Sequence, residues 1–210
     1  MTAIDQERLE RTTTDGAVQH TSLRIEEQAL KLFYEHGFKT TTMREIALAC
    51  DLTPGALYNH FASKDELLST LIVGIHRRMD LLLEGALDDA GDDPVDQLKS
   101  FCRAHALVHA DNITEARVAN REIGKLSPPA LERCVEIRRK ATTQLRDIVN
   151  RGCEAGVFDV ANVVVVCNLI LTMGMSIADW YRPNGDLNKE EMAELHGETA
   201  LRMVSRRGQR

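Results

Sequence analysis

Hydrogen-bonding and cationic side chains gather between residues 41 and 64, on both sides of a short stretch of small residues. The polar residues are Thr41, Thr42, Arg44, Tyr58, Asn59, His60 and Lys64, and the small stretch is Thr53-Pro54-Gly55-Ala56. Such side chains can donate hydrogen bonds to phosphate oxygens, and a helix that starts with small residues can bring its N–H groups close to an anion. The chemistry that this region predicts is therefore recognition of a phosphate-bearing partner.

The elements that position these residues are two short helices. Thr42 and Glu45 have the spacing of a capping box and predict a helix over about 42–49. Thr53 followed by Pro54 predicts a second helix over about 54–60. A tight turn with Leu52 as its apolar plug joins them, which is the pattern of a helix-turn-helix that places its second helix in the DNA major groove. A capped helical hairpin inside a bundle is the alternative.

The segment TTMREIALACDLTPGALYNHFASKDELL at residues 41–68 closely resembles the DNA-binding signature of TetR-family transcriptional regulators. The matching positions are Ile46, Ala47, Gly55, Leu57, Tyr58, Phe61, Ser63, Lys64 and Leu67. The resemblance implies base or groove contacts from Thr42, Arg44, Thr53, Pro54, Gly55 and Ala56, and backbone contacts from Tyr58, His60 and Lys64. One departure is Asp51, where the family usually has glycine; aspartate tolerates the left-handed backbone that such a turn needs.

The composition favours an all-α protein. Charged residues make up 28% of the chain, apolar residues 43% and aromatic residues 4%. The net charge of −6 neither favours nor excludes DNA as a partner, because DNA binding needs only a local basic patch.

Five scattered cysteines without a CxxC pair fit the reducing cytoplasm. We expect the uncharged run at 160–178 to be a buried helix rather than a membrane span, because asparagines interrupt it.

The pattern along the chain predicts three regions. Residues 1–21 are expected to form a flexible arm, residues 22–75 a three-helix DNA-binding domain, and residues 76–210 a helical effector-binding and dimerisation domain. A long helix is expected from Ser63 to about Asp88, and the GDDP linker follows it. Further helices are expected at about 95–110, 113–125, 128–155, 160–181 and 188–206.

Polar residues on apolar helix stripes predict an effector cavity in the second domain. They are His105, His109, Asn120 and Arg138, and the apolar Phe101 on the same stripe as His105 is expected beside them. A mostly apolar cavity with a few polar anchors is the usual makeup of a ligand site; each residue could instead have a core role. His105 and His109 also have metal-ligand spacing, so a metal-dependent helical enzyme is an alternative. Without a third ligand, a nucleophile motif or a phosphate loop, we expect no enzyme activity and no cofactor.

The family resemblance implies a homodimer that binds a double-stranded operator and a small-molecule effector. The apolar helix at 160–181 suits a dimer interface shared with the last helix, although a central core helix would look the same. The segment WYRPNGDLNKEEMAEL at 180–195 resembles members that control fatty-acid and steroid catabolism, which implies an acyl-CoA effector; a simple loop and a non-lipid effector are the alternatives. Such an effector would need cations for its phosphates, for which Arg121, Arg138 and Arg182 are candidates. We expect a repressor, and the sequence does not exclude an activator.

Overall fold

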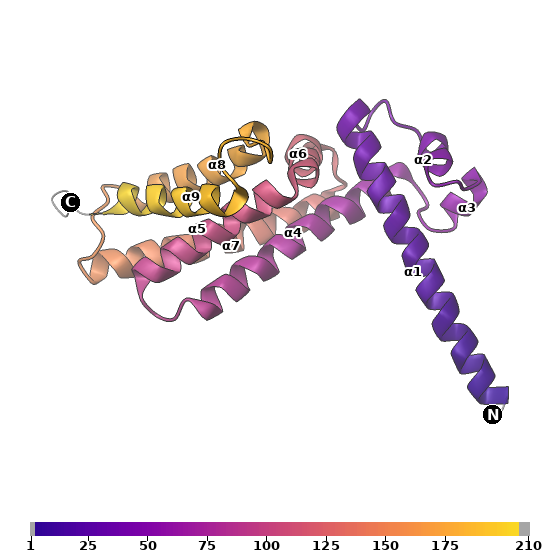
Figure 1. Ribbon diagram of the computed structural model, residues 1–210, viewed down its shortest axis with the longest axis horizontal. Coiled ribbons are helices and arrows are strands. Elements are labelled where there is room, and N and C mark those ends of the chain that lie inside the picture. Colours follow the sequence, from indigo (N-terminus) through magenta and orange to yellow (C-terminus); the bar gives the residue numbers. More distant parts are fainter. Residues whose placement is uncertain (1–2, 206–210) are drawn as a thin grey trace. The chain divides into compact units, whose positions relative to one another are not determined.

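The computed structural model describes residues 3–205, with side chains described from residue 19 onward. Its helices are α1 Ala3–His36, α2 Met43–Ala49, α3 Pro54–Tyr58, α4 Lys64–Asp89, α5 Pro94–Asp111, α6 Ile113–Glu122, the 3-10 helix η1 Ile123–Lys125, α7 Pro128–Glu154, α8 Val163–Trp180 and α9 Lys189–Val204 (Figure 1). Within residues 3–205 the β pairing consists of one isolated bridge between Phe158 and Ser205. The all-α prediction is confirmed.

The chain divides into two compact units, Met1–Leu71 and Ile72–Arg210. The division falls inside α4, a few residues before the predicted boundary at residue 75. The two units are described separately below.

In the N-terminal unit one face of α1 forms a small apolar core together with residues of α2 and α3. Ile25, Ala29 and Phe33 on one face of α1 are fully buried, as are Ile46 on α2 and Leu57 on α3. Gly37 ends α1 with a positive φ of 83°, which glycine adopts without steric cost.

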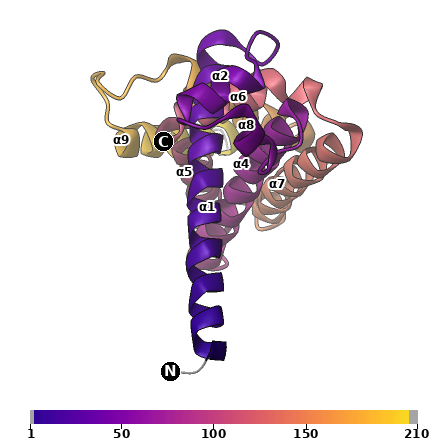
Figure 2. The same ribbon diagram turned by 90° about the vertical axis from the view of Figure 1, so that its right-hand side faces the viewer.

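The start of α1 differs from the prediction. Figure 2 shows α1 as one continuous helix, and it begins at Ala3, in the segment where the sequence analysis expects a flexible arm. This segment has no proline, and its one interior glycine, Gly16, costs a helix only about 1 kcal/mol. Because nucleation is the expensive step, an existing helix extends through polar residues at little further cost. The lack of regularly spaced apolar residues in this segment therefore did not mean that the segment lacks a helix.

The turn between α2 and α3 has the predicted local chemistry. Thr42 and Glu45 form both halves of the capping box. Asp51 has a φ of 54°, so this aspartate occupies the left-handed conformation that glycine usually takes in the family. Leu52 is partly buried, and its N–H donates to the Ala47 carbonyl at 2.9 Å.

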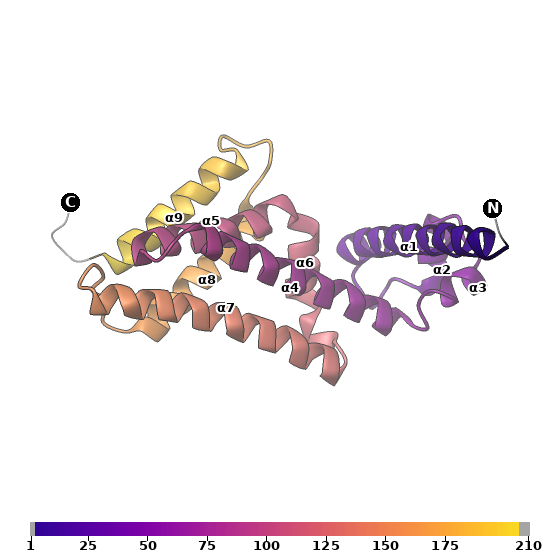
Figure 3. The ribbon, with the colours of Figure 1, turned by 90° about the horizontal axis from the view of Figure 1, so that it is seen from below.

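In the C-terminal unit α5 is the central helix. It packs against α7, α8 and α9, and Figures 1 and 3 show α5 beside α9. The core contains Leu98, Phe101, Leu145, Ile148 and Ile170, all nearly or fully buried. The predicted helices at 95–110, 113–125, 128–155, 160–181 and 188–206 are confirmed, with ends that differ by a few residues.

One glycine allows α8 to approach α5 closely. A Cβ placed on Gly174 of α8 would lie 2.2 Å from Nδ1 of His105 on α5 and 3.2 Å from Nε2 of His196 on α9. A contact of 2.2 Å is not tolerated, so any larger residue would force His105 to move, and the 3.2 Å contact would require a small shift of His196. Gly174 therefore sets the spacing of three helices behind the cavity described below.

The apolar helix α8 is only partly covered by its own chain. By length and composition it could cross a membrane, and a third of it is buried within the unit. Its exposed large apolar residues are Val164, Val165, Leu169 and Trp180. Its other face carries the buried Cys167, Ile170 and Ile177, as in a helix of a bundle.

Candidate functional site

The N-terminal unit exposes the start of α3. The hydroxyl oxygen of Thr53 accepts a hydrogen bond from the Ala56 N–H at 3.1 Å, and Pro54 occupies the first turn. Thr53, Pro54 and Gly55 are exposed, while Leu57 is fully buried and fixes the helix to the core. A Cβ on Gly55 would meet nothing closer than the Thr53 hydroxyl at 4.0 Å. Packing within the chain therefore does not require a glycine there, and the space remains open to a partner.

The predicted residues around α3 also lie at the surface. Arg44, Tyr58 and Asn59 are exposed, with 52% of Tyr58 accessible. Thr42 is exposed too, but its hydroxyl donates to the Glu45 carboxylate at 2.8 Å. The side-chain and backbone hydrogen bonds from Thr42 lower the pKa of Glu45. The structure thus brings most of the predicted DNA-contacting residues to an exposed part of one unit.

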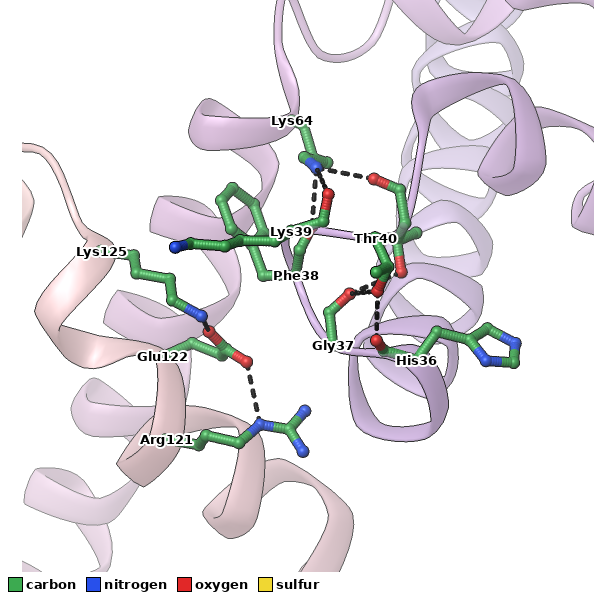
Figure 4. Close-up of polar contacts among 10 residues, drawn as sticks. His36, Gly37, Phe38, Lys39, Thr40, Lys64, Arg121, Glu122 and Lys125 are labelled. Atoms are coloured by element: carbon green, nitrogen blue, oxygen red, sulfur yellow. Dashed lines mark hydrogen bonds and ion pairs between the residues drawn. The ribbon is translucent and has the colours of Figure 1, made fainter.

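Lys64 and Thr41 differ from the prediction. The Lys64 ammonium donates to the carbonyls of Phe38 and Thr41, both at 2.6 Å, and lies 4.5 Å above the Phe38 ring (Figure 4). Thr41 is only 2% exposed, and its hydroxyl donates to the Gly37 carbonyl at 2.9 Å. Both residues hold the loop between α1 and α2 rather than offering a free group to phosphate. Sequence spacing could not show this, because Lys64 contacts carbonyls more than twenty residues away.

His60 also makes a contact within the N-terminal unit. Its Nδ1 lies 3.1 Å from the hydroxyl of Ser22 on α1, and the side chain is half-buried. Ala56 is also half-buried. Among the described residues, the polar groups left most open around α3 are therefore those of Arg44, Tyr58 and Asn59.

The C-terminal unit contains a cavity of about 240 Å³. Its apolar wall is formed by Ile75, Met79, Leu82, Val108, Leu171 and Met175. Four of the five predicted ligand residues line it, namely His105, His109, Asn120 and Arg138. Phe101 does not line it: its ring is fully buried in the core, with its centroid 6.3 Å from that of His105. Helical spacing correctly placed Phe101 on the inward face of α5, but spacing alone cannot distinguish a residue that lines a cavity from one that lies in the core.

His76 of α4 is a cavity residue that the sequence analysis missed. Arg138 Nε donates to His76 Nε2 at 2.9 Å, so that nitrogen must be the acceptor. The proton therefore sits on Nδ1, which lies 2.8 Å from the Ile72 carbonyl and donates to it. Burial, followed by the charge of Arg138, lowers the pKa of His76. A signal existed in the sequence: His76 follows Leu68 and Ile72 at helical spacing, as a polar residue on an apolar stripe.

Three histidines meet on the α8 and α9 side of the cavity. The His105 and His109 rings lie 4.8 Å apart, and the His105 and His196 rings 6.4 Å apart. Burial lowers the pKa of His105 well below its ordinary value and that of His109 to about 4, so both are neutral near pH 7. In the part of the chain that the structure describes, no group of three or more His, Cys, Asp or Glu residues is arranged to hold a metal ion.

Three other cations near α6 already have acidic partners. Arg78 pairs with Glu115, and both line the cavity. Arg121 donates to the nearly fully buried Glu122 at 2.9 Å, and Lys125 contacts the same carboxylate (Figure 4). Of the three arginines considered for an acyl-CoA, only Arg138 lines the cavity.

Comparison with known proteins identifies both units. Residues 25–71 match the family profile described as "Bacterial regulatory proteins, tetR family", and residues 91–204 match "Tetracyclin repressor-like, C-terminal domain". The transcriptional repressor KstR2 of Mycobacterium tuberculosis is 26% identical over 197 residues, which cover 92% of this chain and 97% of KstR2.

Solved structures agree with this result. A tetR-family regulatory protein from Rhodococcus RHA1 is 30% identical, with a TM-score of 0.82 and coverage of 88% of this chain and 97% of that one. AibR, solved in complex with isovaleryl coenzyme A and operator DNA, has the same fold with a TM-score of 0.76, 22% identity and coverage of 88% and 98%.

Proposed function

This chain belongs to the TetR family of bacterial transcriptional regulators, and from that premise we propose that it is a homodimeric repressor released from its operator by a small lipophilic effector. The N-terminal unit would bind a pseudo-palindromic operator, and the C-terminal unit would bind the effector and a second copy of the chain. The observation that carries the effector part of the proposal is the mostly apolar cavity that contains Arg138.

For DNA, the exposed start of α3 is the proposed groove-contacting element. Thr53, Pro54 and Gly55 would approach base edges, with Ala56 behind them, and Thr42 and Arg44 would contact the same groove. Tyr58, Asn59 and His60 would donate to the phosphate backbone. Lys64 would support this surface indirectly, because its ammonium holds the loop that precedes α2.

For the dimer, the uncovered face of α8 is the proposed interface. Val164, Val165 and Leu169 are large apolar side chains, each about half exposed. Leu195 of α9 is also about half exposed, which fits an interface that both helices share. Two copies would present their α3 helices to half-sites separated by roughly one turn of DNA, about 34 Å, or somewhat more.

For the effector, an acyl-CoA or a related lipid is the proposed class. KstR2 is described as a ketosteroid transcriptional regulator, and AibR was solved in complex with isovaleryl coenzyme A. The apolar wall of the cavity supports such a ligand here. A non-lipid metabolite is the alternative. The metal-enzyme alternative receives no support, because His105 and His109 gain no third ligand among the described residues.

Release would proceed through α4. This helix begins at Lys64 and also supplies Ile75, His76 and Met79 to the cavity wall. An effector that packs best against a displaced α4 would favour a dimer whose α3 helices no longer match the operator. The shift in operator affinity can be no larger than the effector's preference for that state.

The test is fluorescence anisotropy of the purified protein on DNA from directly upstream of its own gene, at fixed salt. We expect saturable binding that resists competitor DNA, weakens steeply with salt, and is lost on adding a long-chain acyl-CoA but not free CoA. Arg44→Ala with Tyr58→Phe should weaken binding, whereas Arg139→Ala, at an exposed site on α7, should not. Unchanged affinity in the double variant would contradict the docking surface, and persistence of the complex with acyl-CoA would contradict that effector class.

A further inference from the structure

Arg138 is a cation inside the cavity without an acidic partner. Its hydrogen-bond partners are the neutral His76 ring at 2.9 Å and the Asn120 amide oxygen at 3.3 Å. Among the residues that the structure describes, no carboxylate forms an ion pair with it. The one carboxylate that lines the cavity, Glu115, is paired with Arg78. Arg138 is half-buried, and partly removing a guanidinium from water without a counter-ion costs free energy, which an anion bound beside it would offset.

The other charges around the cavity cancel. Arg78 and Glu115 form an ion pair, and burial lowers the pKa values of His76, His105 and His109, which therefore remain uncharged near pH 7. Arg138 stays protonated although burial lowers its pKa, because a guanidinium holds its proton very strongly. The cavity therefore carries a net charge of about one positive unit, which matches a monoanion rather than a dianion.

The donors needed for that anion are present and unused. A guanidinium has five N–H donors, and only those on Nε and Nη2 have partners among the described residues. His109, which also lines the cavity, is 5% exposed, and neither of its ring nitrogens has a hydrogen-bond partner. A ligand with an anionic end at Arg138 and a hydroxyl or keto oxygen near His109 would satisfy both residues.

We propose that the effector is a small amphipathic monocarboxylate, whose carboxylate binds the Arg138 guanidinium and whose apolar body lies against Met79, Leu82, Val108 and Leu171. This inference rests on the proposed effector-responsive function, and within the lipid class proposed above it selects the free acid rather than the CoA thioester. A carboxylate pairs with a guanidinium through two parallel hydrogen bonds. The volume of about 240 Å³ accommodates a short acid but not a coenzyme A nucleotide in addition. An acyl-CoA would have to leave most of its polar part outside.

The test is calorimetric titration of the full-length protein, without DNA, with hexanoate, octanoate and decanoate. The matching primary alcohols, octyl phosphate and octanoyl-CoA are the comparison ligands. We expect at least one acid to bind more than tenfold tighter than its alcohol and than octyl phosphate. Arg138→Gln should weaken that acid by about 10- to 100-fold. Arg139→Gln is the matched control, since Arg139 is the next residue on α7 and is exposed, and it should leave the affinity unchanged.

Several outcomes would overturn the inference. Alcohols that bind as tightly as acids, acids that do not bind at all, or Arg138→Gln binding like the wild type would each do so. Tighter binding of octanoyl-CoA than of octanoate would assign the cavity to the thioester instead.

A second measurement needs no ligand. Because the uncompensated cation is unfavourable in the empty cavity, Arg138→Gln should keep or raise the thermal midpoint relative to Arg139→Gln. A midpoint several degrees lower would mean that Arg138 has a structural role, and would contradict the inference.

Operator binding by the effector-free protein is assayed separately. If the effector-free wild-type protein does not bind operator DNA, the proposed function is contradicted, whereas carboxylate binding in the calorimetric titration is unaffected. Failure of the proposed function and failure of the carboxylate site are therefore distinguishable.

Discussion

The proposed DNA-contacting surface and the cavity are assembled in different ways. The surface at residues 42–59 consists of exposed side chains fixed by neighbours three residues away, such as Thr42 with Glu45 and Thr53 with Ala56. The cavity is lined by side chains from five helices, most of them buried or half-buried, and its key contact, between Arg138 and His76, joins residues 62 positions apart. Local hydrogen bonds maintain the first arrangement, whereas close packing and burial maintain the second.

This difference predicts which changes each unit tolerates. A cap residue acts on one helix end and contributes about 1 kcal/mol. A packed residue behind the cavity acts on several helices at once, and overpacking there costs more. The predictions that follow test this contrast and run from the largest expected effect to the smallest.

Gly174→Ala should give the largest loss. Its Cβ would lie 2.2 Å from Nδ1 of His105, and His105 has little room to move because His109 packs against it. We expect about 1–3 kcal/mol of lost stability in urea unfolding. Gly85→Ala is the matched control, since Gly85 is also helical but has nothing within 4 Å of its added Cβ. That variant should be neutral or up to about 1 kcal/mol more stable; equal losses in both would refute the packing argument.

Stability should fall with acid through His109. Burial, helped by the charges of Arg138 and nearby histidines, lowers its folded pKa to about 4, whereas a free histidine titrates near 6.5. Between these values the unfolded chain binds more protons, so stability is complete above about pH 6.5 and declines as the pH falls towards 4, by up to about 1.4 kcal/mol per pH unit. Urea midpoints measured from pH 7.5 to 4.5 test this. His109→Gln should reduce the slope, and an unchanged slope would show that His109 is not its source.

Thr53→Ala should cost about 1 kcal/mol, because the Ala56 N–H loses its acceptor at the start of α3. Thr53→Ser keeps the hydroxyl and should be close to wild type. Ser127→Ala is a second control: Ser127 precedes α7 but makes no side-chain cap hydrogen bond, so its loss should not be measurable. Equal effects at Thr53 and Ser127 would show that cap geometry does not distinguish the two helix starts.

Asp51→Gly should have the smallest effect and a favourable one. Asp51 holds a φ of 54°, which glycine adopts with less strain, so we expect a gain of about 0.5–1 kcal/mol. Removing its carboxylate should also strengthen operator binding slightly. Asp51→Asn separates the two contributions, since it removes the charge but keeps a side chain that tolerates this conformation. A stability loss in the glycine variant would contradict the assigned turn.

Much of the helical frame was predictable from the sequence, because helix starts depend on short-range signals. The Thr42 and Glu45 pair, the Thr53-Pro54 start, the Asp51 turn and the Gly37 stop lie within a few residues of the structure that they determine. The same reasoning gave His105, His109, Asn120 and Arg138 as inward-facing polar residues, and the cavity brings them together. It did not predict that α1 begins at Ala3, and it placed Phe101 at the ligand cavity, whereas that ring lies in the core.

The sequence by itself therefore determined the helix ends, the helix-turn-helix and the faces that turn inward, since these depend on the 3.6-residue period and on capping. Only the tertiary structure decided what the polar groups do. It turned Lys64 into a support for a loop, placed His76 behind Arg138, and left that guanidinium without an acid in an apolar cavity. The physical reason is that burial and ion pairing depend on which distant segments meet, and the spacing of residues along a single helix does not contain that information.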